Sequence, residues 1–254
     1  MPSRWLTSAL RRIKDLAIAR KVAFTLKALR ELAELSLDEE DACDVLASLT
    51  VEDCAGRKRS ATTGEWMYVF KPNVAGRVLY VKVILRINCV LISFHEDDDG
   101  SMKKTGKQKP LARRPLRAIP DEACPSCGTE MVEKRGALRL PVNGEEISVP
   151  SAPHLSCPKC GEIVLRFQDA RRLREDAIAI YRKRHGLLSA DEIRAIRERY
   201  SLTQADLARL LRLGGNTVSR WESGRNVQTA AMDMLLRLIR DLPGSLDYLR
   251  DHAA

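Results

Sequence analysis

The chain has 254 residues, 44% of them hydrophobic and 30% charged, with a formal net charge of +9. This length allows two or three small hydrophobic cores, and no apolar run reaches the roughly 18 residues of a membrane span. We therefore expect a modular cytoplasmic protein without a membrane partner. The positive charge favours polyanionic partners, but charge alone does not distinguish DNA from RNA.

The first part of the chain alternates between two hydrophobic periods. Helical spacing of leucines predicts helices over 4–17 and 26–37, and Ser36 is the expected cap of a third helix that runs to Leu49. The period then changes to two, which predicts strands over 66–71, 78–85 and 89–95. A short turn joins the last two strands, so we expect them to pair antiparallel.

The last two predicted strands place reactive side chains on one surface. We expect Val90, Ile92 and Phe94 on the core face of the last strand, because they alternate with polar residues. The opposite surface should then carry five side chains: Tyr80, Lys82, Cys89, Ser93 and His95. A phenol, a cation and an imidazole are suited to metal-free phosphodiester cleavage, although exposed tyrosine and lysine are also ordinary on a strand.

Residues 8–96 resemble the MqsR toxin family. The resemblance rests on the helical opening and on two stretches, ELAELSLDEEDACDVLASLTVED and EWMYVFKPNVAGRVLYVKVILRINCVLISFHED. It implies a RelE-like α+β fold and an endoribonuclease that cleaves mRNA without a metal. The active-site tyrosine of the family falls on Tyr80, and a family lysine falls on His95, which retains a proton donor. Met67 replaces a family glutamine, and another family lysine falls near Gly56, beside Lys58. The catalytic candidates are thus Tyr80, His95, Lys82 and Lys58.

Residues 98–122 separate this part from the rest. Seven basic residues and no acidic residue lie between Lys103 and Arg117, which favours a flexible linker; a phosphate-binding arm is the alternative. Met102 is typical of an internal start, which suggests a junction of two reading frames, natural or engineered.

Two Cys-x-x-Cys-Gly motifs follow, at Cys124/Cys127 and Cys157/Cys160. Four thiolates in paired turns fill a tetrahedral shell around one structural Zn²⁺ and leave no open position for catalysis. Two disulfides or a redox pair are the alternatives. The long gap between the motifs predicts strands over 131–150, with Asn143-Gly144 as the hairpin turn.

A helix over 167–184 leads to a helix-turn-helix. Ser189 and Glu192, and then Thr203 and Asp206, predict capping boxes at two helix starts. Gly214-Gly215 precedes a short helix over 216–223, which we interpret as the recognition helix; a plain helical bundle is the alternative. The DNA-binding candidates are Gln204, Asn216, Thr217, Ser219 and Arg220.

Residues 123–250 resemble the MqsA antitoxin family. The matching stretches are CPSCGTEMV, LSCPKCGE, SLTQADLARLL and GGNTVSRWESG. The resemblance implies a zinc domain that binds toxin, an Xre-type helix-turn-helix that reads DNA through Asn216 and Arg220, and a homodimer. An apolar stripe belongs either to the dimer surface or to the domain's own core: Met234, Leu235, Leu238, Ile239 and Leu242.

These observations predict a mixed α+β chain of five segments. They are a toxin domain (1–97), a basic linker (98–122), a zinc-binding domain (123–166), a connecting helix (167–188) and a helix-turn-helix domain (189–254). We expect a toxin and its antitoxin in one chain: an mRNA interferase inhibited by contact within or between chains, and an autorepressor that binds palindromic operator DNA. The alternative is a transcriptional regulator whose toxin-like domain is inactive.

Overall fold

The computed structural model describes residues 3–97 and 122–252, so the predicted linker lies outside the described residues except for Glu122. The first range forms α1 (Arg4–Ile18), β1 (Val22–Thr25), α2 (Leu26–Glu34), α3 (Glu39–Ser48), β2 (Cys54–Arg59), β3 (Trp66–Phe70), β4 (Asn73–Val74), β5 (Arg77–Leu85) and β6 (Cys89–Glu96). The second forms β7 (Val132–Val142), β8 (Glu145–Ser156), β9 (Ile163–Arg166), α4 (Phe167–Arg184), α5 (Ala190–Arg199), α6 (Gln204–Leu210), α7 (Thr217–Glu222), α8 (Ala230–Asp241) and α9 (Ser245–His252). The mixed α+β class is as expected.

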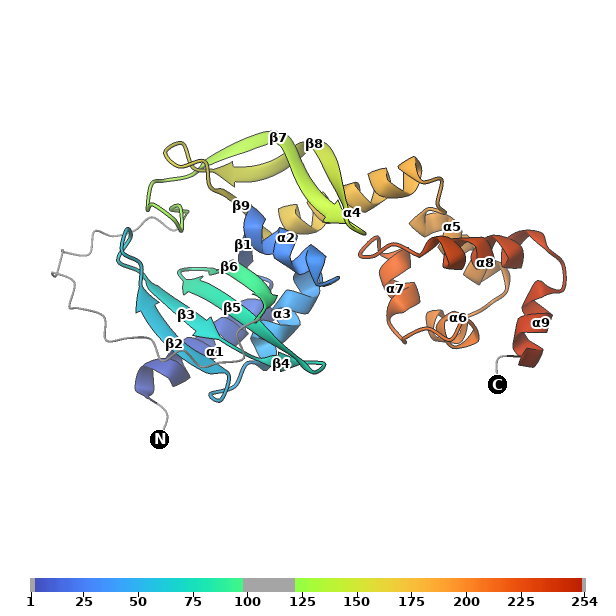
Figure 1. The fold of residues 1–254 in the computed structure, drawn as a ribbon, viewed down its shortest axis with the longest axis horizontal. Coiled ribbons are helices and arrows are strands. Elements are labelled where there is room, and N and C mark those ends of the chain that lie inside the picture. Colours follow the sequence, from blue (N-terminus) through green and yellow to red (C-terminus); the bar gives the residue numbers. More distant parts are fainter. Residues whose placement is uncertain (1–2, 98–121, 253–254) are drawn as a thin grey trace.

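The strands of both ranges join in one sheet (Figure 1). Its order is β2-β3-β5-β6-β1-β9-β8-β7, with β4 paired to β5. Strand β1 pairs with β6 in parallel and with β9 antiparallel, in the register Ala23↔Arg166, Phe24↔Leu165 and Thr25↔Val164. The predicted toxin and zinc domains are therefore continuous through backbone hydrogen bonds, and β1 does not present an open edge.

One hydrophobic core also spans the two ranges. It contains Phe24, Leu46 and Phe94 from the first range together with Leu140 and Leu165 from the second, and each of these side chains is at most 1% exposed. Burial of such a side chain contributes about 1.5–3 kcal/mol. The first range thus shares its core with the zinc-binding segment as well as its sheet.

Helix α3 is confirmed, but its predicted cap is wrong. Asp38 is the N-cap: it accepts hydrogen bonds from the N–H groups of Glu40 and Asp41, and Asp41 accepts one from the N–H of Asp38. Ser36 instead has a φ of 59° in the turn after α2. A carboxylate at the cap matches the positive end of the helix and places negative charge at this end of α3.

A β-bulge corrects the predicted faces of β6. Tyr80 pairs with His95 and Lys82 with Ser93, but Val83 pairs with Leu91, so one residue of β6 is left without a partner. An extra residue reverses the faces of the residues beyond it. Cys89 is therefore fully buried in the core with Leu91 and Phe94, and the predicted outward position of Cys89 is wrong.

The C-terminal helices α5–α9 have a second core. It includes Ile193, Leu207, Val218, Trp221 and Leu236. The two predicted capping boxes, at the starts of α5 and α6, are confirmed. Among the described residues, every helix is too short or too polar to cross a membrane.

Candidate functional site

The four predicted metal ligands lie together. The Sγ atoms of Cys124 and Cys160 are 3.5 Å apart, those of Cys127 and Cys157 are 3.4 Å apart, and all four lie within 4.8 Å of one another. Tetrahedral coordination with Zn–S bonds of about 2.3 Å requires sulfurs roughly 3.8 Å apart. Disulfide sulfurs lie about 2.05 Å apart, and all four cysteines are free thiols. The cluster therefore fits one metal ion.

The two cysteine turns have the same conformation. Gly128 and Gly161 both have a φ of 75°, and their N–H groups donate to the carbonyls of Cys124 and Cys157 at 2.9 and 3.0 Å. Hydrogen bonds with Thr129 lower the pKa of Cys127 to about 6, which favours the thiolate that a metal ion binds. Soft thiolates in this geometry suit Zn²⁺, and the residues present fit such an ion.

A second group of candidates lies on β5 and β6. The rings of Tyr80 and His95 are stacked, with centroids 4.9 Å apart and planes at 17°. Lys82 Nζ lies 6.0 Å from the Tyr80 ring, and the Lys82 strand position is paired with Ser93. Strand pairing thus brings the predicted phenol, imidazole and cation together on one surface.

Lys58 joins this surface from β2. Its strand position pairs with Met67, which pairs with Ile84, two residues beyond Lys82 and on the same side of β5. Burial lowers the pKa of Lys82, and the positive charges of Lys58 and Lys27 lower it further. Burial also raises the pKa of Tyr80, so the phenol keeps its proton at neutral pH. The surface offers a proton donor, an imidazole and two cations.

The antitoxin-like part makes polar contacts with the neighbouring hairpin. Among the described residues, the ring contacts and hydrogen bonds of Tyr80, Lys82 and His95 stay within the first range. In contrast, Arg86 makes two 2.8 Å bonds to Glu65 and also donates to the carbonyl of Ala123. The β2–β3 hairpin, which carries Lys58, is thereby tied to the start of the zinc-binding segment.

The predicted DNA-binding residues have different surroundings. Asn216 is exposed as the N-cap of α7, while Thr217 and Ser219 are half-buried. Gln204 donates a 2.8 Å hydrogen bond to the buried carboxylate of Glu222. That carboxylate also accepts from Arg197 at 2.7 and 3.0 Å, so Gln204 contributes to the packing of α5, α6 and α7 against one another.

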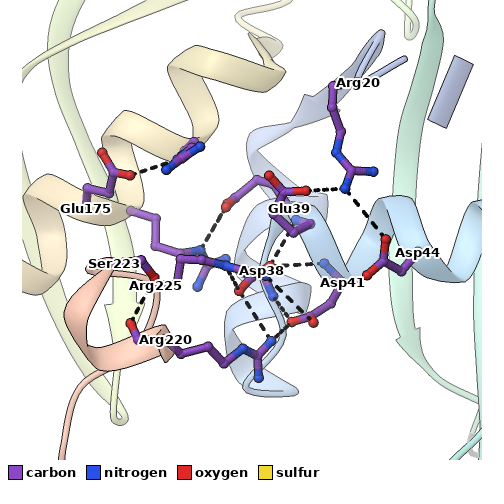
Figure 2. Close-up of polar contacts among 12 residues, drawn as sticks. Arg20, Asp38, Glu39, Asp41, Asp44, Glu175, Arg220, Ser223 and Arg225 are labelled. Atoms are coloured by element: carbon purple, nitrogen blue, oxygen red, sulfur yellow. Dashed lines mark hydrogen bonds and ion pairs between the residues drawn. The ribbon is translucent and has the colours of Figure 1, made fainter. Parts of the chain in front are cut away.

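Arg220 turns toward the N-terminus of α3 (Figure 2). It donates to Asp38 at 3.3 Å and also to Asp41, while Arg225 makes two hydrogen bonds to Asp38 at 2.7 and 2.8 Å. We call this group of Asp38, Asp41, Arg220 and Arg225 the α3–α7 clamp. It joins the predicted toxin domain to the predicted recognition helix.

Burial opposes the negative charges of the clamp, and the two arginines offset it at Asp38. The Asp38 side chain is 3% exposed, and burial alone would raise its pKa; the hydrogen bonds and charge of Arg225 hold that pKa below its ordinary value. Beside the clamp, Arg174 of α4 pairs with Glu39 at 3.0 Å, and the two side chains are 9% and 3% exposed. Removing one partner of such a buried ion pair would leave the other charge buried and uncompensated, which is strongly destabilising.

Arg182 fixes α7 to α4. It is buried, donates to the carbonyls of Trp221 and Asn226 at 3.0 and 3.1 Å, and has its pKa lowered to about 10 by burial. The roles of Arg174, Arg182 and Arg225 were not predicted, because arginines are frequent in this chain and only the tertiary structure brings these three to their partners.

The predicted apolar stripe of α8 is divided. Ile239 is fully buried in the domain's own core. Met234, Leu238 and Leu242 are 59%, 46% and 54% exposed. The core reading therefore holds for Ile239, and three large apolar side chains remain on the surface.

Two family models match the chain, one on each side of the predicted linker. The model described as the antitoxin component of bacterial toxin-antitoxin system, MqsA, matches residues 122–250. The model described as motility quorum-sensing regulator, toxin of MqsA, matches residues 7–96. No curated protein matches the chain.

Proposed function

Because this chain belongs to the MqsA antitoxin family and also carries an MqsR toxin domain, we propose that its antitoxin part restrains a ribonuclease and binds operator DNA. The β1–β9 pairing is the observation that carries this proposal, since it joins the two family domains through a shared sheet. Covalent linkage keeps the two parts at high effective concentration. The five predicted segments remain the functional units: toxin, linker, zinc domain, connecting helix and DNA-binding domain.

The toxin domain, with a RelE-like fold, would cleave mRNA with side chains alone. Tyr80 keeps its proton because burial raises its pKa, so it serves as the donor to the leaving 5′-oxygen. His95, stacked on it, accepts the proton of the attacking 2′-hydroxyl. Lys82 and Lys58 supply positive charge for the phosphorane. The position of Lys58 depends on the hairpin that Arg86 ties to Ala123, which gives the antitoxin part a means of restraint.

The four cysteines would hold one structural Zn²⁺ per chain. A bound metal would connect the two knuckles that precede β7 and follow β8. Such a metal would supply stability and not catalysis, because four thiolates leave no position for substrate.

The C-terminal domain would act as an Xre-type repressor. Asn216 and Arg220 suit adenine and guanine, respectively, in the major groove. A homodimer that buries Met234, Leu238 and Leu242 would present two recognition helices to half-sites of a palindrome about 34 Å apart. Because the clamp holds Arg220, operator binding requires α7 to leave α3.

A growth assay tests the ribonuclease. We expect cells to tolerate the intact chain, whereas residues 1–97 alone should arrest growth and cleave mRNA. His95→Ala or Tyr80→Phe should relieve the arrest at equal expression. If residues 1–97 are folded by circular dichroism yet harmless, the chain is a regulator with an inactive toxin-like domain; Met67 and Gly56, where family residues are replaced, favour this second candidate.

Mobility-shift titration tests the DNA reader. Asn216 lies outside the clamp, so Asn216→Ala should weaken binding to the chain's own promoter at fixed salt without changing fold or metal content. Unchanged affinity would contradict the assignment of α7 as the recognition helix.

A further inference from the structure

An arginine of the edge strand β2 lies between two tryptophan rings. The guanidinium carbon of Arg57 is 4.3 Å from the ring centroid of Trp5 and 4.0 Å from that of Trp66. Arg59 also lies over Trp66, at 4.8 Å. We call Trp5, Arg57, Arg59 and Trp66 the tryptophan–arginine patch.

The patch is positively charged and partly open to solvent. Arg59 is exposed, and Trp5, Arg57 and Trp66 are half-buried. Throughout residues 3–97 and 122–252, no carboxylate forms an ion pair with Arg57, Lys58 or Arg59. The two arginines of the patch are therefore suited to an external anion.

Strand alternation connects the patch with the candidate catalytic surface. Arg57 and Arg59 point to one side of β2, and Lys58 points to the other side, where Lys82 lies. Two strand spacings of about 4.8 Å separate β2 from β5, and Lys82 lies two residues along β5 from Ile84, the position in register with Lys58, so the Cα atoms of Lys58 and Lys82 lie roughly 12 Å apart. Strand β2 is the edge of the sheet, and a chain can pass around it from one face to the other.

We propose that the tryptophan–arginine patch binds single-stranded RNA next to the bond that is cleaved. Unpaired bases stack on indole rings and guanidinium planes, while the phosphates contact the arginines. Duplex DNA does not offer its base faces in this way, and an acidic peptide would use the charges but leave the rings unused. This inference rests on the proposed ribonuclease function and adds a substrate-binding site to it.

The first cysteine turn of the antitoxin part lies beside the hairpin that carries most of the patch, and the patch remains accessible. A Cβ added at Gly128 of the first cysteine turn would lie 3.5 Å from Thr63 Cγ2 at the tip of the β2–β3 hairpin. Arg59 and Trp66 lie in the two strands of this hairpin, and both remain accessible in the intact chain. The intact chain can therefore be used to measure RNA binding.

The test measures binding of a labelled, 2′-O-methylated single-stranded RNA to the intact chain by fluorescence anisotropy. Trp66→Leu should weaken binding about 5- to 150-fold, the range for loss of one stacked base. The double variant Arg57→Gln/Arg59→Gln should reduce the slope of log Kd against log salt by about 1.4, at roughly 0.7 per phosphate contact. RNA should also quench tryptophan fluorescence, because two of the three tryptophans lie in the patch and Trp221 is buried.

Arg77→Gln is the matched control. Arg77 is exposed and lies six residues along β5 from Val83, which is in register with Tyr68 and Arg57. If Arg59→Gln, on an exposed side chain, and the double variant bind like this control, the patch is only structural and the proposal fails. If the patch variants weaken binding of a polyglutamate of matched charge as much as binding of RNA, the patch is a general polyanion site and the proposal also fails.

The readout separates this proposal from the ribonuclease itself. A 2′-O-methylated RNA lacks the attacking 2′-hydroxyl, so its binding is measured without cleavage. Patch-dependent binding by a chain whose freed toxin domain cleaves nothing would support the RNA site and refute the enzyme.

Discussion

Replacing Asp38 by asparagine should open the α3–α7 clamp and tighten binding of operator DNA by about 30-fold. Asparagine is as good an N-cap as aspartate, so α3 should remain intact. The substitution removes the charge that accepts two hydrogen bonds from Arg225 and one from Arg220. Only the fraction of molecules with a free recognition helix can bind DNA, so a less stable clamp raises that fraction.

The expected 30-fold gain in affinity is based on the exposure of Arg220 and Arg225. Hydrogen bonds to charged groups contribute about 1.5–3 kcal/mol when buried. Arg225 and Arg220 are 26% and 23% exposed, so solvent screens them and we take about 2 kcal/mol for the whole group, which corresponds to roughly 30-fold. The gain saturates once the open state is dominant.

The assay is an anisotropy titration at fixed salt with a labelled fragment of the chain's own promoter. Asp44→Asn is the control, because Asp44 lies on the same helix, is 73% exposed and pairs only weakly, at 3.7 Å, with Arg20. If Asp38→Asn binds no better than Asp44→Asn while Asn216→Ala still weakens binding, the recognition helix is already free and the reasoning from the clamp is refuted.

Three further predictions concern the metal, the catalytic surface and the buried ion pair. Cys157→Ser should remove the metal, measured by elemental analysis, and lower the thermal midpoint, because metal binding to such a site contributes folding free energy; a full metal content would contradict the four-thiol site. Lys58→Gln should raise the pKa of Lys82 by removing a neighbouring positive charge. The loss of kcat/KM at high pH, measured for the freed toxin domain, should then occur at higher pH. If this loss occurs at the same pH as before, deprotonation of Lys82 is not its cause. Arg174→Met should lower the free energy of unfolding by about 3–5 kcal/mol in denaturant titration, because Glu39 is left buried and unpaired. The double variant Arg174→Met/Glu39→Gln should recover much of this free energy. If it recovers none, the single substitution acted through lost packing and not through the unpaired charge.

Local signals in the sequence were reliable where a short motif carries its own physical cause. Asn143-Gly144 predicts the tight turn between β7 and β8, and the capping boxes at Ser189 and Thr203 predict the starts of α5 and α6. Strands β1 and β2 were not predicted. Strand β1 has only four residues, and β2 is a charged edge strand with Gly56 inside it, so neither shows the alternation of a half-buried strand.

The sequence by itself determined the parts of this protein: two cysteine knuckles, the short C-terminal helices and strands that carry Tyr80, Lys82 and His95. Each depends on neighbouring residues, whose spacing is visible in the chain. Only the tertiary structure decided that β1 pairs with β9 and that Arg220 reaches Asp38, 182 residues away. Backbone pairing across strands uses groups that every residue has, and an ion pair between distant residues exists only after two domains have docked, so neither leaves a pattern in the sequence.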